Sequence, residues 1–407
     1  MNGKTVILKT IENKVFPAYA AQVVDPHTVV IGGGGSGNTG TFNGLVFLRI
    51  EHDGNSSYSV LDGTFSTMEP ADTMAMHEQD NEKFIAVGLS KECMICKISR
   101  RKKQADSLAN GIEDISPIEY SAVTISSEVV CASSCVTRVR ISPDGTFLAV
   151  GCENGSIKIY SFPGMVLIRE ILAHKELISD LDITEDGQKI CSVARNGSGT
   201  MWQVKDGKRL NDLELPKCAK YTFKRVKFSR ASSNNKIWLY AIANPVVKST
   251  NSSVLYKFNT ANFSIKDKAL FSKDILSALA TSSDSSYIAV GNMNGDVMVH
   301  DAKTLMRVYL FKADRFGAIT DLEFLRLPIP FQTIDGSMTL ALVSTSLNGF
   351  TRLHSLTEDT RPNIWFLILL ILLGVLLVYI LKIFEVDVII SEFIQSLIGP
   401  DGVKTEL

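Results

Sequence analysis

Three segments of the chain repeat one order of features, and this repetition constrains the fold more than any other part of the sequence. They begin at Val136, Leu177 and Ile275, and each reads as a strand, an aspartate-containing turn, an apolar strand, an Asn-Gly turn and a last strand. Asp144 and Asp186 occupy equivalent turns and lie 42 positions apart. A unit of this kind cannot bury its apolar face alone, so the pattern predicts similar units packed side by side.

A period of roughly 40–45 residues with four short antiparallel strands is typical of WD-type β-propeller blades. Weaker units at about Met74–Ile98, Lys220–Phe258 and Ile319–Leu356, with a first unit that contains a glycine-rich stretch, bring the total to seven. We therefore predict an all-β fold, a seven-bladed WD-type β-propeller over residues 1–360. Thr5–Leu8 would add a closing strand to the last blade and remove an exposed sheet edge.

Aromatic and histidine side chains recur at fixed places in these units. Trp202 and Tyr160 occupy the place of the WD tryptophan, and His300 lies similarly in a later unit. His174 fits the histidine that WD repeats carry ahead of their second strand. We interpret His174 as a hydrogen-bonding residue that stabilises its blade and not as a catalyst.

An apolar segment near the C-terminus differs from the rest of the chain. Residues 364–381 contain no charged side chain, and Trp365 and Tyr379 lie near the two ends. About 18 apolar residues can cross a hydrocarbon core of roughly 30 Å, and aromatic side chains favour its borders. The segment predicts a single transmembrane helix over residues 364–384.

The orientation of that span follows from weaker features. The N-terminus lacks a secretory signal, and seven cysteines spread over 407 residues fit a reducing compartment. We expect a cytosolic propeller, contact with membrane lipid, and a short lumenal tail over residues 385–407. The chain ends with Lys404–Leu407, one substitution from the retrieval signal KDEL, which agrees with an endoplasmic reticulum membrane protein.

The glycine-rich stretch raises the question of a phosphate site. Gly32, Gly34 and Gly37 match the spacing GxGxxG after the apolar run Thr28–Ile31. A dinucleotide site requires a helix that opens at these glycines, whereas the β-forming sequence Leu45–Ile50 follows them. Without a helix N-terminus to meet a pyrophosphate, nucleotide binding by this loop is not expected.

A long hairpin connection is the remaining interpretation of residues 32–44. It exceeds the two to five residues that a hairpin needs, and loops of this length are often functional. With few side chains, its backbone carbonyl groups could converge on a monovalent or divalent cation and hold the tip, Asn38–Asn43, rigid for a partner. A flexible linker is the alternative that the sequence leaves open.

Charge and cysteine spacing argue against two other classes of protein. A formal net charge of -1 is unlike a nucleic-acid-binding domain. The basic run Arg100–Lys103 is the one feature that favours a DNA-binding regulator, but we interpret it as a solvated loop between the second and third blades. Cys93 and Cys96 form a CxxC without a second ligand pair, so we expect buried thiols and no zinc site.

The opening of the first unit resembles a known family. Pro17-Ala18-Tyr19, the glycines Gly32–Gly35, Thr39-Gly40 and Asn43-Gly44, followed by a propeller, one span and a short tail, are similar to the family of the prolactin regulatory element-binding protein and the yeast endoplasmic reticulum exchange factor. This resemblance implies a guanine nucleotide exchange factor, which makes and breaks no bond. Its target would be the Sar-type small GTPase that starts COPII coat assembly and transport from the endoplasmic reticulum to the Golgi.

The resemblance also assigns roles within the glycine stretch. It implies a potassium ion held by the ion-binding part of the loop, and a tip that contacts the GTPase, with Asn43 the residue that promotes exchange. The potassium ligands would come from Gly32, Gly33, Gly34, Gly35 and Asn38. The partner-binding tip would be Asn38, Thr39, Gly40, Thr41, Phe42 and Asn43, although Thr41-Phe42 departs from the relatives. The alternative is a membrane-anchored WD scaffold that recruits coat or cargo proteins without exchange activity.

Overall fold

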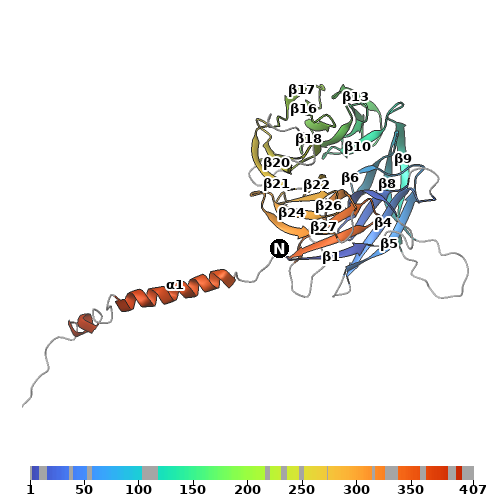
Figure 1. Cartoon of the computed structure of the whole chain (residues 1–407). Coiled ribbons are helices and arrows are strands. Elements are labelled where there is room, and N and C mark those ends of the chain that lie inside the picture. The colour runs from blue at the N-terminus through green and yellow to red at the C-terminus, as the bar shows by residue number, and fades with distance from the viewer. Residues whose placement is uncertain are drawn as a thin grey trace, which may run out of the picture. The chain divides into compact units, whose positions relative to one another are not determined.

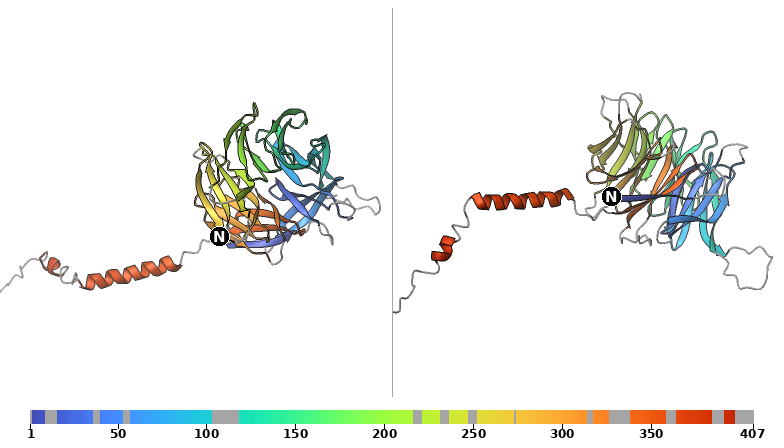
Figure 2. Two further views of the ribbon diagram at one scale, coloured as in Figure 1. Left: turned by 45° about the horizontal axis from the view of Figure 1, so that its top comes forward. Right: turned by 60° about the horizontal axis from the view of Figure 1, so that its bottom comes forward.

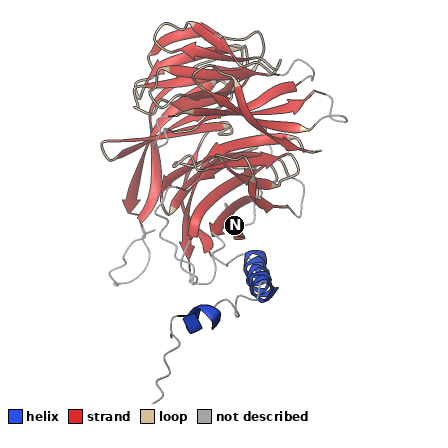
Figure 3. Ribbon diagram, turned by 90° about the vertical axis from the view of Figure 1, so that its left-hand side faces the viewer, coloured by secondary structure: helices blue, strands red, loops and turns tan. Residues whose placement is uncertain are grey.

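The computed structural model describes most of the chain: residues 2–8, 16–35, 40–52, 57–102, 118–215, 221–230, 236–246, 252–272, 274–313, 317–325, 338–357, 364–383 and 391–396. The chain divides into two compact units, Met1–Glu358 and Asp359–Leu407. Strands build the first unit and helices the second (Figure 3).

Seven four-stranded antiparallel sheets form the first unit and follow one another round a ring (Figures 1 and 2). Each is a propeller blade, and the predicted seven-bladed all-β propeller is confirmed. From the inner strand outward, the first blade consists of β2 (Ala18–Asp25), β3 (Thr28–Gly33), β4 (Gly44–His52) and β5 (Ser57–Ser66). The second blade consists of β6 (Thr73–Gln79), β7 (Glu82–Gly88), β8 (Glu92–Lys102) and β9 (Ile118–Val129). The third blade consists of β10 (Val136–Ile141), β11 (Phe147–Cys152), β12 (Ser156–Ser161) and β13 (Leu167–Leu172).

The remaining four blades have the same order. The fourth blade consists of β14 (Ile178–Ile183), β15 (Lys189–Ala194), β16 (Gly199–Gln203) and β17 (Arg209–Asp212), and the fifth of β18 (Tyr221–Phe228), β19 (Trp238–Pro245), β20 (Ser253–Asn259) and β21 (Ile265–Phe271). The sixth blade consists of β22 (Leu276–Thr281), β23 (Tyr287–Asn292), β24 (Val297–Asp301) and β25 (Arg307–Phe311). The seventh blade consists of β26 (Ile319–Phe324), β27 (Met338–Ser346), β28 (Thr351–Thr357) and β1 (Asn2–Leu8).

The last blade joins the two ends of the propeller sequence. Strand β1 pairs antiparallel with β28, with Thr5 opposite His354. His354 lies within 3.0 Å of the Thr5 hydroxyl and within 2.9 Å of the Ser344 hydroxyl. The predicted closing strand is therefore confirmed, and it covers a sheet edge that would otherwise be exposed.

The predicted turns owe their shape to side-chain hydrogen bonds. The Asp144 carboxylate accepts a hydrogen bond from the backbone N–H of Thr146 at 3.2 Å, and Asp186 accepts one from Gln188 at 3.0 Å. Such aspartates replace the missing ladder partners of a tight turn, which explains why the residue recurs at this place in each repeat.

His174 has the structural role predicted for it. Its two ring nitrogens lie 2.8 Å from the Ser198 hydroxyl and 2.7 Å from the Ser192 hydroxyl, and the Trp202 indole N–H donates to Ser192 at 2.9 Å. Burial lowers the pKa of His174 to about 4, so the ring is neutral at physiological pH. The network ties the strands of the fourth blade to the connection that precedes them.

The apolar core lies between neighbouring blades. One cluster joins Ile95 of the second blade to Val139 and Tyr160 of the third. Cys93 and Cys96 are buried in such clusters, and burial raises the pKa of the Cys96 thiol to about 11. Both cysteines therefore pack as small apolar groups, as predicted.

The prediction that the basic run Arg100–Lys103 forms a loop between the second and third blades was wrong. Strand β8 continues to Lys102 and pairs with β9, so the run ends a strand inside the second blade instead of linking two blades. Arg100 can occupy a strand because its guanidinium pairs with Asp25 at 3.1 Å and lies over the Tyr120 ring at 4.8 Å. Lys103 lies outside the described residues.

The second unit contains α1 (Ile364–Ile383), which covers most of the predicted span, and a short helical stretch at 391–396. The large apolar side chains of α1 between Ile368 and Ile380 are exposed. In the part of the chain that the structure describes, no helix has both the length and the hydropathy to cross a membrane.

Candidate functional site

The candidate site is the connection between β3 and β4 of the first blade, residues 34–43, which we call the glycine loop. Gly33 and Gly44 are paired across the ladder at its base. The structure describes Gly34, Gly35 and residues 40–43, whereas Asn38 and Thr39 of the predicted site lie outside the described residues. Strands β3 and β4 thus bring the two ends of the loop together.

The loop lies at the face of the propeller where the inner strands begin. Ala18, the first residue of inner strand β2, pairs with Gly33 at the loop base. The seven blades repeat one strand order, so all inner strands start at this side, which we call the loop face. The described parts of the connections between successive blades lie at the same face.

Backbone hydrogen bonds hold the loop base on both sides. The N–H of Gly34 donates to the Pro17 carbonyl at 3.0 Å, and the N–H of Thr67 donates to the Asn43 carbonyl at 3.0 Å. The Gly33 carbonyl accepts a bond from Ala71 at 3.2 Å. The base is therefore attached to the segment before β2 and to the connection that leads to the second blade.

Asn43 joins three parts of this region through its side chain. Its Oδ1 accepts a hydrogen bond from the Gly35 N–H at 3.0 Å, and its Nδ2 donates to the Met68 carbonyl at 3.3 Å. The amide thus links the outgoing and returning arms of the loop to the next connection. Sequence reasoning had assigned Asn43 a partner contact and missed this structural role, because neither partner is near in sequence.

Close packing accounts for part of the glycine run. At Gly44, where φ is +142°, a Cβ atom would lie 2.0 Å from the Phe65 carbonyl oxygen. At Gly34, where φ is +145°, it would lie 2.2 Å from Oδ1 of Asn43. Side chains are excluded at both positions by sterics and by backbone conformation.

The described part of the predicted partner-binding tip is not uniformly exposed. Phe42 is half-buried and packs on the core of the first blade, with its ring 5.9 Å from that of Phe16. Gly40 is exposed, and Thr41 and Asn43 are half-buried. Phe42 therefore anchors the returning arm, a role that sequence reasoning missed because Phe16 belongs to a different connection.

The predicted potassium site consists mainly of backbone groups at the base of the glycine loop. Gly32 and Gly33 are the last residues of β3, and the carbonyl oxygen of Gly33 already accepts the bond from Ala71. Gly34 and Gly35 begin the loop, whereas Asn38 lies outside the described residues. The assignment of potassium to these five residues therefore stays a prediction.

The fold and its turn networks define a WD-repeat β-propeller. The model of the family described as "WD domain, G-beta repeat" matches residues 126–161, in the second and third blades. The chain is also similar to whole proteins of one kind. It is 24% identical to the guanine nucleotide-exchange factor SEC12 of rat over 402 residues, covering 90% of this chain and 94% of that protein.

Two further relatives have the same or a similar name. The mouse guanine nucleotide-exchange factor SEC12 matches with the same identity and coverage, 24% and 90% of this chain. SEC12-like protein 1 of Arabidopsis thaliana is 30% identical over 192 residues, which are 46% of this chain and 45% of that protein. The resemblance to the exchange-factor family, inferred from the glycine stretch and the layout of the chain, is confirmed.

Proposed function

We propose that this protein is a guanine nucleotide exchange factor for a Sar-type small GTPase and that it starts COPII coat assembly at the endoplasmic reticulum. The observation that carries the proposal is the similarity to proteins named guanine nucleotide-exchange factor SEC12 along 90% of the chain. The hydrogen bonds that hold the base of the glycine loop to the propeller support this proposal, because they fix the place from which the loop would meet a GTPase.

Exchange of this kind requires no bond chemistry from the protein. A GDP-bound GTPase would dock on the loop face, and the glycine loop would press on the nucleotide pocket and favour the nucleotide-free state. A partner shifts such an equilibrium only by its difference in affinity for the two states. The Asn43 side chain supports this mechanism by joining the arms of the loop to the connection at Met68.

We further propose, from the sequence and although α1 as described does not meet the criteria for a membrane-crossing helix, that residues 364–384 anchor the propeller to the endoplasmic reticulum membrane, with the propeller cytosolic and residues 385–407 lumenal. The uncharged sequence of residues 364–381 and the exposed apolar side chains of α1 support this assignment. Deletion of residues 364–383 should release the protein from isolated membranes into the soluble fraction, whereas the full chain should resist extraction with alkaline carbonate. Release of the full chain by carbonate would contradict the anchor.

The test of exchange is the release of a fluorescent GDP analogue from a Sar-type GTPase in the presence of the full chain in detergent. The wild-type protein should accelerate release, and Asn43→Ala should slow the accelerated rate about tenfold, equivalent to about 1.4 kcal/mol in the barrier. Replacing potassium by sodium in the buffer tests the predicted ion. Absence of any acceleration by the wild-type protein would refute the proposal.

A scaffold without exchange activity is the competing outcome of that experiment. A scaffold would bind coat or cargo proteins equally well after the loop tip is shortened, and GDP release would be the same with and without it. Asn154→Ala is a suitable control for nonspecific destabilisation. Asn154 makes a similar local hydrogen bond, to the Ser156 N–H at 3.1 Å, in the third blade.

A further inference from the structure

The centre of the propeller holds a cavity of about 400 Å³ lined by all seven inner strands. Charged side chains line it in two tiers, because equivalent strands carry them at equivalent register positions. In β10, β14, β18 and β26, the pairing with the next strand shifts by one residue. The first paired residues after these shifts form one tier, which consists of Arg138, Asp180, Arg225 and Asp321. The second tier lies two residues further along each strand and consists of Arg140, Asp182, Lys227 and Glu323.

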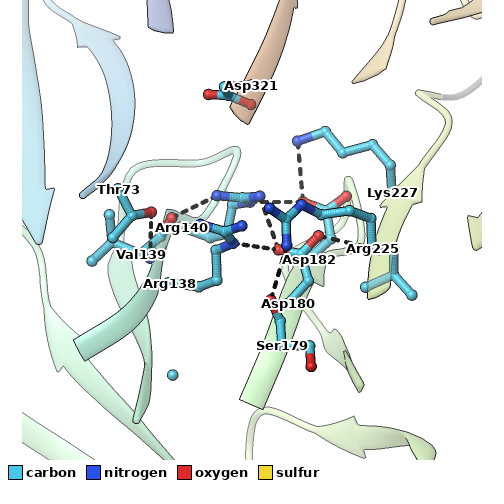
Figure 4. Close-up of polar contacts among 12 residues, drawn as sticks. Thr73, Arg138, Val139, Arg140, Ser179, Asp180, Asp182, Arg225, Lys227 and Asp321 are labelled. Carbon is cyan, nitrogen blue, oxygen red and sulfur yellow. Dashed lines mark hydrogen bonds and ion pairs between the residues drawn. The ribbon is translucent and has the colours of Figure 1, made fainter. Parts of the chain in front are cut away.

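The two aspartates of β14 already have several partners (Figure 4). Asp180 Oδ1 lies 3.2 Å from Nε of Arg138 and 3.2 Å from Nη2 of Arg140. Its Oδ2 accepts a hydrogen bond from the N–H of Val226 on β18 at 3.1 Å. Asp182 repeats the pattern: Nζ of Lys227 lies 3.5 Å from Oδ1. Three cations on β10 and β18, namely Arg138, Arg140 and Lys227, thus share two carboxylates on the strand between them.

Arg225 is the cation of the two tiers whose charge is least neutralised by carboxylates. Its Nη1 donates to two backbone carbonyls, those of Ser179 at 3.3 Å and Lys224 at 3.2 Å. Among the described residues, no ion pair joins its guanidinium to a carboxylate. Burial, together with the positive charge of Arg138, lowers the pKa of Arg225 to about 9. Among the described residues, Arg225 is therefore the cation of the two tiers without an ion pair, whereas Asp180 and Asp321 act on it from a greater distance.

The next inner strand, β22, presents uncharged side chains to the cavity beside these cations. Among the described lining residues, β22 contributes Leu279, Ala280 and Thr281, which carry no charge. Asp321 stands beyond it on β26, and its Oδ2 accepts the backbone N–H of Ala21 at 3.0 Å. An anion placed beside Arg225 would thus meet cations on one side and the uncharged side chains of β22 on the other, with the Asp321 carboxylate beyond them.

We propose that the wall of Arg138, Arg140, Arg225 and Lys227 binds a phosphoryl oxyanion, either inorganic phosphate or the phosphate group of a larger molecule. Hydrogen bonds between guanidinium groups and phosphate are charge-assisted, and they are strong where water is scarce. The fold has already brought the cations together, so little ordering is needed when the anion binds.

The experiment measures binding of inorganic phosphate and of pyrophosphate to the full chain in detergent, by calorimetry and thermal unfolding, against sodium chloride at matched ionic strength. Both phosphates should bind at a single site and raise the unfolding temperature more than chloride does. Arg225→Gln should weaken binding by about tenfold or more, since it removes a charge-assisted contact. Asp321→Asn should strengthen binding because it removes a negative charge and keeps an acceptor for Ala21.

Arg209→Ala is the matched control, because Arg209 is an exposed arginine of β17 that pairs with Asp212 outside the channel. Equal phosphate binding by the Arg225→Gln, Arg209→Ala and wild-type proteins would overturn the proposal, as would phosphate binding no tighter than chloride. If Arg225→Gln does not fold, Lys227→Gln gives the same test. Tighter binding of pyrophosphate than phosphate would identify a diphosphate group as the ligand, and the reverse order would identify a single phosphate.

Discussion

The amide oxygen of Asn43 accepts a hydrogen bond from the backbone N–H of Gly35, and this bond spans the base of the glycine loop. Asn43→Ala removes the acceptor, so the free energy of unfolding should fall by about 1–2 kcal/mol. Asn43→Asp keeps an acceptor and loses the donor to Met68, so it should cost less. Chemical denaturation measures the cost, and faster hydrogen exchange at residues 33–45 should accompany it. Unchanged exchange there would contradict the structural role of Asn43.

The glycines at the two ends of the returning arm should respond differently to a methyl group. Gly44→Ala places a Cβ against the Phe65 carbonyl at 2.0 Å, so we expect a loss of about 3 kcal/mol or more in unfolding free energy. Gly40→Ala meets open space, and with φ of +67° it should cost only about 1 kcal/mol. Urea denaturation of the two variants in parallel gives the comparison. Similar costs would show that the base is less closely packed than described.

Asp180 connects three neighbouring blades, since it pairs with Arg138 and Arg140 and accepts the N–H of Val226. Asp180→Ala leaves these cations without their shared carboxylate, and we expect a loss of about 3–5 kcal/mol. Asp206→Ala, in an exposed turn where the carboxylate accepts the Lys208 N–H at 3.0 Å, should cost about 1 kcal/mol. Equal effects of the two substitutions in a denaturant titration would contradict this assignment.

Acid should weaken the fold through the same carboxylate. Burial alone would raise the pKa of Asp180, but Arg140 and Arg138 more than offset it and hold the pKa below the ordinary value of 3.8. The carboxylate therefore contributes stability above pH 3.8, and this contribution is lost as the pH falls through the lower folded-state value. The Asp180→Asn protein should lose less stability than the wild type between pH 4 and the acid transition. Parallel stability profiles would refute the expectation.

His354 should make the closure of the propeller sensitive to pH in a higher range. Burial, with a contribution from Arg352, lowers its pKa from 6.5 to about 3. Between these values the unfolded chain binds a proton that the folded chain does not, so stability should fall by about 1.4 kcal/mol per pH unit below 6.5. His354→Gln should flatten this slope in urea denaturation at pH 7.5, 6 and 5. An unchanged slope would exclude His354 as its source, and His174 would then be tested in the same way.

The sequence predicted the parts of the fold that depend on neighbouring residues. Aspartate and Asn-Gly turns, strand alternation and the period of the repeats are local patterns, and they led to the correct blade number and to the closing strand at Thr5–Leu8. The uncharged run at 364–381 likewise led to a helix, α1. The basic run at Arg100 was wrongly predicted to be a loop, because runs of charged residues usually lie in loops. Here Arg100 is accommodated in a strand by its ion pair with Asp25 and its contact with the Tyr120 ring.

The repeating blades and the apolar helix were thus determined by the sequence itself, because strand alternation and turn chemistry act over a few residues. Only the tertiary structure decided which residues come together at the candidate site and in the central cavity. Asn43 meets Met68, and Phe42 meets Phe16, across separate connections. The two tiers of charge in the channel arise from the register of strands about one blade apart in sequence, as for Arg138 and Asp180. Such contacts depend on how the ring closes, which no local pattern encodes.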